Sequence, residues 1–109
     1  KDIVGPVTGA LDKVLQLEAF YYKPNELAKS LGYEDNKIRV GLSAQKVKEV
    51  QPEAVTPASF DLDENKQSKS GENYLGVDYE RLVPLLVEAI KEQQGQIEAL
   101  KAEIAALKQ

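Results

Sequence analysis

Cysteine, histidine, tryptophan and methionine are all absent from this chain of 109 residues. Without cysteine there is no disulfide and no thiolate metal site. Without histidine, the common Ser-His and Cys-His nucleophile pairs and the usual zinc sites are excluded. We therefore expect no metal and no cofactor, and the first functional hypothesis concerns assembly rather than small-molecule chemistry.

A strong charge of one sign and a long apolar run are also missing. Fourteen basic and eighteen acidic residues give a net charge of −4, with the two signs interspersed. Non-specific binding to nucleic acid needs a basic stripe. No apolar run approaches the roughly 20 residues of a membrane helix, and no signal peptide is visible. We expect neither nucleic acid nor a membrane as a partner. A chain of this length supports one small core.

The hydrophobic pattern predicts an α+β fold, mainly helical, in which a small globular domain precedes one long helix. Four strand-like runs are expected at residues 19–22, 38–42, 54–60 and 74–77. Three short helices are expected: from Thr8, as N-cap, through Leu17; from Glu26 to Leu31, capped by Asn25 and closed by Gly32; and from Ala44 to Val50, capped by Ser43 and ending before Pro52.

Residues 61–73 form a polar segment between two strand-like runs, which predicts a protruding loop or hairpin. Asp61, Asp63 and Asn65 alternate as in a calcium-binding loop. The glycine and glutamate that such a loop requires at its sixth and twelfth positions are missing, so we expect no calcium site.

We divide the chain into a globular part, residues 1–78, and a long helix, residues 79–109. Two starts are open for this helix. With Asp78 as N-cap, Pro84 lies inside the helix and bends it. With a start nearer Arg81, Pro84 lies in the first turn, where proline is tolerated.

The last third of the chain carries apolar residues at alternating steps of three and four. We call this set the seam: Val83, Leu86, Ile90, Gln93, Ile97, Leu100, Ile104 and Leu107. A stripe with this 3.5-residue spacing predicts a coiled coil, because one helix cannot cover it alone.

The number of strands in the coil stays open at this point. Ile at one seam position with Leu at the other favours two parallel strands, and the polar Gln93 is typical of a layer that fixes register. The alternative to a coiled coil is a single amphipathic helix that packs on its own domain through residues 83–90.

Three blocks of sequence resemble one family. They are ALDKV at residues 10–14, IRVGLSAQKVKEVQPEAV at 38–55 and YLGVDYERLVPLLVEAIKEQ at 74–93. Their order, their spacing and the coiled coil that follows closely resemble the self-cleaving intramolecular chaperone domain at the C-terminus of phage endosialidases, tailspikes and tail fibres. The motif residues are Gly41, Ala44, Gln45, Val47, Pro52, Glu53, Val55, Val77, Asp78 and Tyr79.

This resemblance implies a homotrimer that helps a β-rich fibre or tailspike, upstream in the same polypeptide, to fold in register. The domain is then released by autoproteolysis. The resemblance places this assembly in the host cytoplasm, on the precursor of a virion tail. Cleavage in the family falls before the Ser of a Ser-Asp-x-Arg-Leu-Lys motif, and a Ser-Lys dyad needs no histidine.

The nucleophilic Ser of that motif is expected upstream of this chain, which begins without Met and which we interpret as a fragment or a processed product. Lys1 is either the dyad Lys or, as we favour, the residue after it. We therefore expect no catalytic residue and no protease activity in this chain. Two alternatives remain: a self-cleaving protease once the upstream Ser is restored, and a plain oligomerisation or adaptor module.

Four residues of these blocks have a plain structural role beside a family-specific one. Ser43 is expected to cap a helix rather than act as a nucleophile. Gln45 either pairs with buried backbone or is an exposed helix residue. Asp78 and Tyr79 either fix the start of the long helix against the globular part or, as we favour, are simply its cap and a core aromatic.

Overall fold

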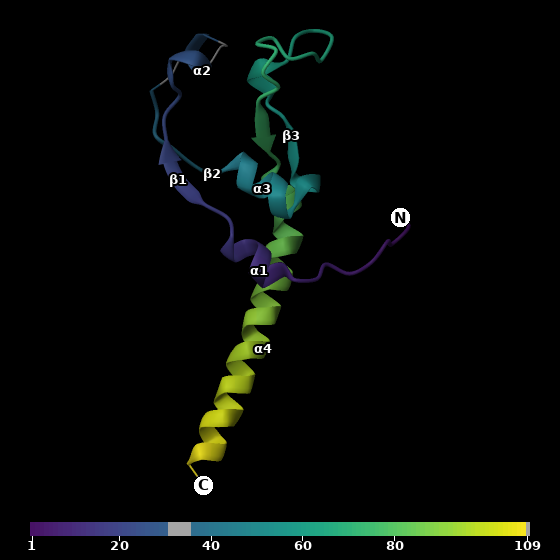
Figure 1. Cartoon of the computed structure of the whole chain (residues 1–109), viewed down its shortest axis with the longest axis vertical. Helices are drawn as coiled ribbons and strands as arrows, with labels where there is room; N and C mark the ends of the chain where they lie inside the picture. The colour runs from purple at the N-terminus through teal and green to yellow at the C-terminus, as the bar shows by residue number, and fades with distance from the viewer. Residues whose placement is uncertain (31–35, 109) are drawn as a thin grey trace.

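The computed structural model describes residues 1–30 and 36–108. The molecule is elongated, with extents of 66 × 37 × 18 Å. A single long helix forms a stalk of about 37 Å, and two arms rise from its N-terminal end (Figure 1). The helices are α1 (Ala10–Leu15), α2 (Glu26–Ser30), α3 (Ala44–Val50) and α4 (Val83–Leu107), and the 3-10 turns are η1 (Pro52–Ala54), η2 (Ser59–Asp61) and η3 (Tyr79–Leu82).

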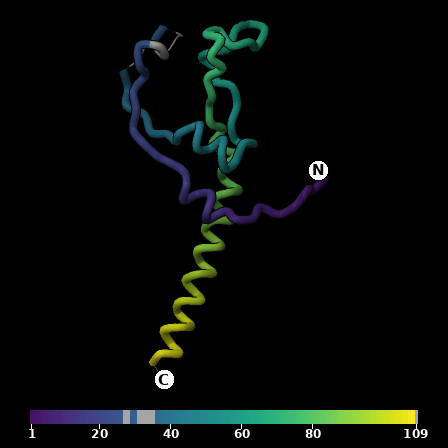
Figure 2. Tube along the Cα trace, in the orientation of Figure 1, coloured from purple at the N-terminus to yellow at the C-terminus, as the bar shows by residue number. Residues whose placement is uncertain are grey.

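Each arm contains one antiparallel sheet of two strands. In the first arm β1 (Ala19–Tyr22) pairs with β2 (Arg39–Leu42). In the second, β3 (Val55–Pro57) pairs with β4 (Leu75–Val77). Figure 2 shows the two arms separating above α4, which continues alone below them. The α+β class, the short hairpins and the long C-terminal helix are therefore confirmed.

One predicted strand is shorter than expected. The strand predicted at 54–60 is only three residues long, because 3-10 turns at η1 and η2 flank it on both sides. The helix predicted from Glu26 begins where expected, and Leu31 and Gly32 lie outside the described residues.

The core lies where α1, α3 and the first turns of α4 meet. Leu85 and Val47 are its largest buried apolar side chains, at 1% and 0% exposure. Alanines complete it, and their small side chains let α1 approach α4 closely. The buried cluster is Ala10, Val47, Ala54, Leu82, Leu85 and Ala89. The core thus extends past residue 78, and the first turns of α4 belong to the globular unit.

Helix α1 begins one residue later than predicted. The N-cap is Gly9 and not Thr8, and no side chain of the cap residue bonds to the helix. Gly9 has a φ of 62°, a left-handed conformation that glycine adopts without steric cost. The helix ends at Leu15 because the N–H groups of Gln16 and Leu17 bond three residues back, in a tightened last turn.

Helix α3 follows the sequence prediction. Ser43 is its N-cap, and its Oγ accepts a hydrogen bond of 3.4 Å from the N–H of Lys46. Val47 and Val50 are buried beneath the helix. The cap and the apolar spacing are both local signals, which is why the sequence was sufficient here.

The later start of α4 is confirmed. Residues 79–82 form the 3-10 turn η3, and α4 begins at Val83. Pro84 therefore lies in the first turn, where its missing N–H removes no intrahelical hydrogen bond. Asp78 precedes the 3-10 turn without capping it through its side chain. Its Oδ2 instead lies 3.1 Å from Nε of Arg81.

Candidate functional site

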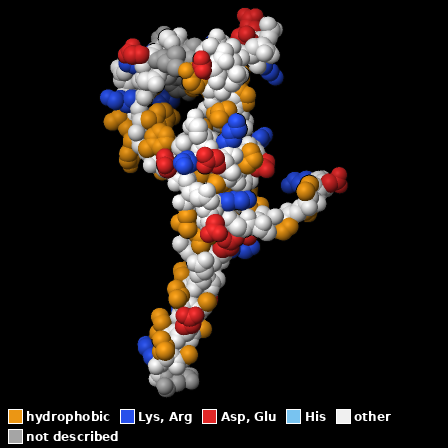
Figure 3. All heavy atoms as spheres, viewed as in Figure 1, with side chains coloured by type: hydrophobic (Ala, Val, Ile, Leu, Met, Phe, Trp, Pro, Cys, Tyr) orange, Lys and Arg blue, Asp and Glu red, His pale blue; other side chains and the backbone are white. Residues whose placement is uncertain are grey.

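Helix α4 has two apolar faces with different surroundings. One face packs on the domain, where Leu82, Leu85 and Ala89 are 3%, 1% and 4% exposed. The other is the seam, whose seven apolar members are between 41% and 85% exposed. Gln93 is exposed as well. Figure 3 shows hydrophobic side chains following the stalk down to its end.

Residues 83–90 do pack on their own domain, as the alternative to a coiled coil predicts, through Leu85 and Ala89. The seam residues of this stretch stay exposed. Leu85 is buried in the core of the domain, whereas its neighbour Leu86 is 42% exposed. Successive helical residues are about 100° apart, so one helix presents these two leucines in different directions. A continuous apolar stripe that the chain itself leaves uncovered marks a surface for interaction.

Beyond Glu92 the stalk receives no support from its own domain. Every residue from Gln93 to Lys108 is exposed. An isolated helix of this length is marginally stable in water, because most helix stability in proteins comes from packing of an apolar face. We call residues 93–108 the lower stalk, and its own domain does not provide such packing.

A side chain of the stalk also caps the N-terminus of α1. Oε1 of Glu92 accepts a hydrogen bond of 3.0 Å from the N–H of Ala10, and Oε2 accepts one of 2.9 Å from the N–H of Leu11. We call this arrangement the Glu92 cap. Gly9 has no side chain to satisfy these groups, so a carboxylate from α4 does so. The sequence analysis missed this role, although Glu92 lies within the third family block.

The motif residues lie together at a junction between α3, the second arm and the start of α4. Val55 and Val77 are directly opposite in the β3–β4 sheet. The N–H of Asp78 donates to the carbonyl of Ala54 at 2.8 Å. Nη1 of Arg81 donates to the carbonyl of Glu53 at 3.1 Å. Pro52 begins η1, between α3 and β3. These residues thus orient the arms relative to the stalk.

Gly41 is the point where the first arm meets the start of the stalk. Oη of Tyr79 lies 3.1 Å from the N–H of Leu42, which donates to it. A Cβ at Gly41 would lie 2.9 Å from that Oη and 3.1 Å from Cε1 of Tyr22. Glycine is thus favoured here by the close approach of two tyrosines. Tyr79 is 50% exposed, so its expected place in the core is wrong, and its hydroxyl instead bonds to the first arm.

Replacing Gly41 by Ala should destabilise the domain by about 1–3 kcal/mol, because the new methyl group displaces the Tyr79 hydroxyl. Urea unfolding measures this loss. The double variant G41A/Y79F should recover part of it, since the phenylalanine lacks the clashing oxygen. As a control, Gly95→Ala in α4 meets no atom within 4 Å and should stabilise the helix slightly. Equal stability of G41A and the parent chain would contradict the assignment.

Of the two roles expected for Gln45, the structure shows that of an exposed helix residue. Its side chain is exposed on α3, and its Oε1 lies 3.5 Å from Oγ of Ser43. Pairing with buried backbone is therefore not found. Ala44, its neighbour, is half-buried and lines the cleft between the arms.

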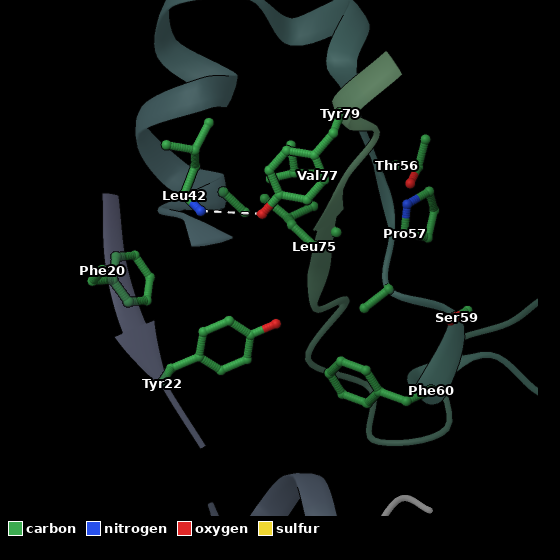
Figure 4. Close-up of a pocket in the computed structure, with 13 residues that line it drawn as sticks. Phe20, Tyr22, Leu42, Thr56, Pro57, Ser59, Phe60, Leu75, Val77 and Tyr79 are labelled. Carbon is green, nitrogen blue, oxygen red and sulfur yellow. Dashed lines mark hydrogen bonds between the residues drawn. The ribbon is translucent and has the colours of Figure 1, made fainter. Parts of the chain in front are cut away.

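A cleft of about 460 Å³ separates the two arms. Phe20 and Tyr22 approach it from β1, and Leu75 and Val77 from β4, while Phe60 closes its far end (Figure 4). The lining is mainly aromatic and aliphatic, with hydroxyl groups from Thr56, Ser59 and the two tyrosines. Among the residues that the structure describes, no Asp, Glu, Lys or Arg lines it.

The polar loop of the second arm is anchored by Asp61. Asp61 is 1% exposed. Its carboxylate accepts hydrogen bonds from Oγ of Ser68 and from the N–H groups of Ser70 and Tyr74, the last two at 2.9 and 3.3 Å. Burial raises the pKa of Asp61, but these hydrogen bonds favour the carboxylate more strongly and hold its pKa below the usual value of 3.8.

A lowered pKa makes the loop sensitive to acid. The carboxylate of Asp61 contributes stability fully above pH 3.8, and this contribution is lost as the pH falls through the lower folded value. We expect Asp61→Asn to flatten the acid limb of the stability profile and to speed amide exchange at Ser70 and Tyr74. Ser68→Ala should shift the same limb in the same direction. Urea unfolding as a function of pH checks both, and an unchanged limb in D61N would contradict the assignment.

The structure offers little for metal or proton chemistry elsewhere. In residues 1–30 and 36–108, no three acidic side chains gather as metal ligands. Lys1 is exposed at the end of the N-terminal segment. Within the same described ranges, no helix has both the length and the apolar content to span a membrane.

Together these features define a class of architecture: a small α+β domain on a stalk helix with an uncovered heptad face. A family model described as chaperone of endosialidase (peptidase S74) matches residues 1–56, about half of the chain. The chain therefore belongs to the chaperone of endosialidase family. A search of curated proteins finds no match for it.

Proposed function

We propose that this domain associates as a homotrimer through the seam and thereby helps a fibre or tailspike segment, upstream in the same polypeptide, to fold in register. The observation that carries the proposal is the exposure of the seam on a helix whose opposite face completes the domain core. Membership of the chaperone of endosialidase family supports the chaperone role.

The mechanism is proximity. Three chains joined by their stalks experience one another at a high effective concentration, which lowers the entropic cost of starting an intertwined β structure. Helix α1 packs against α4, and the N-terminal segment leaves the domain beside the first turns of the stalk (Figure 1). Association of the stalks would therefore bring the three α1 helices close to a common axis, while residues 1–8 run outward from the stalk (Figure 1).

Burial of the seam supplies the driving force. Removing one Leu or Ile side chain from water is worth roughly 1.5–3 kcal/mol before entropy is subtracted. Each chain offers six Leu or Ile side chains and Val83, and Gln93 supplies one polar layer that favours a single register. In the proposed trimer the lower stalk gains the packing that its own domain does not provide.

Release is the second part of the proposal. The Ser of an upstream Ser-Asp-x-Arg-Leu-Lys segment attacks the carbonyl of the residue before it, and the motif Lys takes the proton from the hydroxyl group. The C–N bond of that peptide breaks, and the proton passes to the Ser nitrogen, which becomes the new amino terminus of the domain. Water then hydrolyses the ester that joins the Ser oxygen to the upstream segment, and the domain leaves the folded fibre.

Native mass spectrometry of the chain at micromolar concentration tests assembly first. A trimer supports the proposal, and a monomer overturns it. A chain extended upstream by the Ser-Asp-x-Arg-Leu-Lys segment should yield two bands on a denaturing gel, and its Ser→Ala variant only one. If the upstream fibre refolds equally well with and without this domain while the domain remains trimeric, the adaptor alternative replaces the chaperone role.

A further inference from the structure

The Glu92 cap joins two parts of the molecule that are far apart in sequence. Its two hydrogen bonds connect residues 82 and 81 positions apart. The groups they satisfy are the first two N–H groups of α1, whose own N-cap residue provides no side chain. Helix α1 has six residues, too few for an isolated helix to be stable in water. Its order therefore depends on contacts with α4.

Glu92 also marks a boundary along the stalk. It is the last residue of α4 that is half-buried, and every residue from Gln93 to Lys108 is exposed. Unwinding of an unsupported helix proceeds from its free end inward, because terminal turns have the fewest hydrogen bonds to lose. Glu92 is the first residue with a tertiary role that such unwinding reaches.

We propose that Glu92 is a positioning residue that couples packing of the seam to the order of α1 and the direction of the N-terminal segment. We call this coupling the relay. When the lower stalk is packed against partner stalks, the helix holds the carboxylate over α1, and α1 fixes the direction in which residues 1–8 leave the domain. When the stalk is unpartnered and unwinds, the carboxylate is withdrawn and α1 loses its cap. This inference rests on the proposed function and adds a direction to it, from the C-terminal seam to the N-terminal segment.

Glu92 differs from two other acidic residues of the stalk, Glu88 and Glu98, in the contacts that its side chain makes. Glu98 accepts a hydrogen bond of 2.6 Å from Gln94 and lies 3.9 Å from the ammonium of Lys101, all on the same helix. Glu88 pairs with Lys91 at 3.4 Å, again within α4. These contacts are local to the helix, whereas the contacts of Glu92 leave it. Glu98→Ala is therefore a matched control for Glu92→Ala.

Amide hydrogen exchange by NMR on the complete chain tests the cap itself. We expect Glu92→Ala to speed exchange at Ala10 and Leu11 about tenfold, the size of effect that loss of a helix cap produces. Glu92→Gln, which keeps one acceptor oxygen, should give a smaller change, and Glu98→Ala none. Protection at Val47 in α3 shows in every sample that the domain is folded. Unchanged exchange at Ala10 and Leu11 in both Glu92 variants would overturn the proposal.

A seam variant tests the relay without touching the cap. In Ile97→Asp/Ile104→Asp, both substitutions lie below Glu92 in the unsupported stalk. We expect faster exchange at Ala10 and Leu11 as well as loss of the trimer, with native mass measured on the same samples. Loss of the trimer with unchanged exchange at α1 would overturn the relay and leave the proposed function intact. A parent chain that is monomeric throughout would overturn both.

Discussion

The double variant Ile97→Asp/Ile104→Asp should be monomeric at concentrations where the parent chain is a trimer. Each substitution removes an apolar contact worth roughly 1.5–3 kcal/mol and places a carboxylate where a dry interface would form. Because a symmetric assembly repeats each change in every copy, the association constant should fall by at least about a thousandfold. Sedimentation velocity or native mass spectrometry measures the change directly.

The control for this variant is Ala99→Asp/Ala106→Asp. These alanines are exposed on the same stretch of α4 but lie outside the seam. The control introduces the same two charges into the same helix, so it separates the effect of the seam from a general loss of helix stability. A control that dissociates as readily as the seam variant would argue against the seam as the interface.

The second large effect concerns Leu85 and Leu86, adjacent residues on different faces of α4. Leu85 is 1% exposed in the core. Its replacement by Ala should destabilise the domain by about 2–5 kcal/mol, a large share of the 5–15 kcal/mol that holds a typical small domain folded. Leu86 is 42% exposed, so Leu86→Ala should weaken association and change the stability of the dissociated domain by less than about 0.5 kcal/mol.

Urea unfolding at a concentration below association, combined with native mass at a higher one, separates the two variants. L85A should lose stability in the dilute sample, and L86A should lose trimer in the concentrated one. The opposite pattern would mean that α4 is rotated about its axis relative to the domain, with Leu86 in the core and Leu85 in the interface.

Local features of the fold were predicted correctly from the sequence. The Ser43 cap and the apolar spacing of α3 are contained within a few neighbouring residues, and so are the turn signals around the two hairpins. The strands at 54–60 and the start of α1 were less accurate. Short strands in a two-stranded sheet are bounded by the turns beside them, and Thr8 was a plausible cap whose place was taken by a carboxylate from another helix.

Choices between two local alternatives needed the folded chain. Pro84 is compatible with a bend in the middle of a helix or with its first turn, and the 3-10 turn at Tyr79–Leu82 decides for the first turn. Asp61 belongs by composition to a solvated loop. Folding instead buries it and surrounds it with hydrogen bonds from residues 68–74, which lowers its pKa.

The sequence by itself determined the seam, because its 3.5-residue period is written into one continuous segment and any helix there must display it. It also determined the absence of thiol, imidazole and disulfide chemistry, since those side chains are missing. Only the tertiary structure decided that the domain covers Leu85 and leaves Leu86 free, and that Glu92 completes α1. The Glu92 contacts join residues 82 and 81 positions apart, and the core around Leu85 includes residues as distant as Ala10. No local pattern specifies how such segments meet in space.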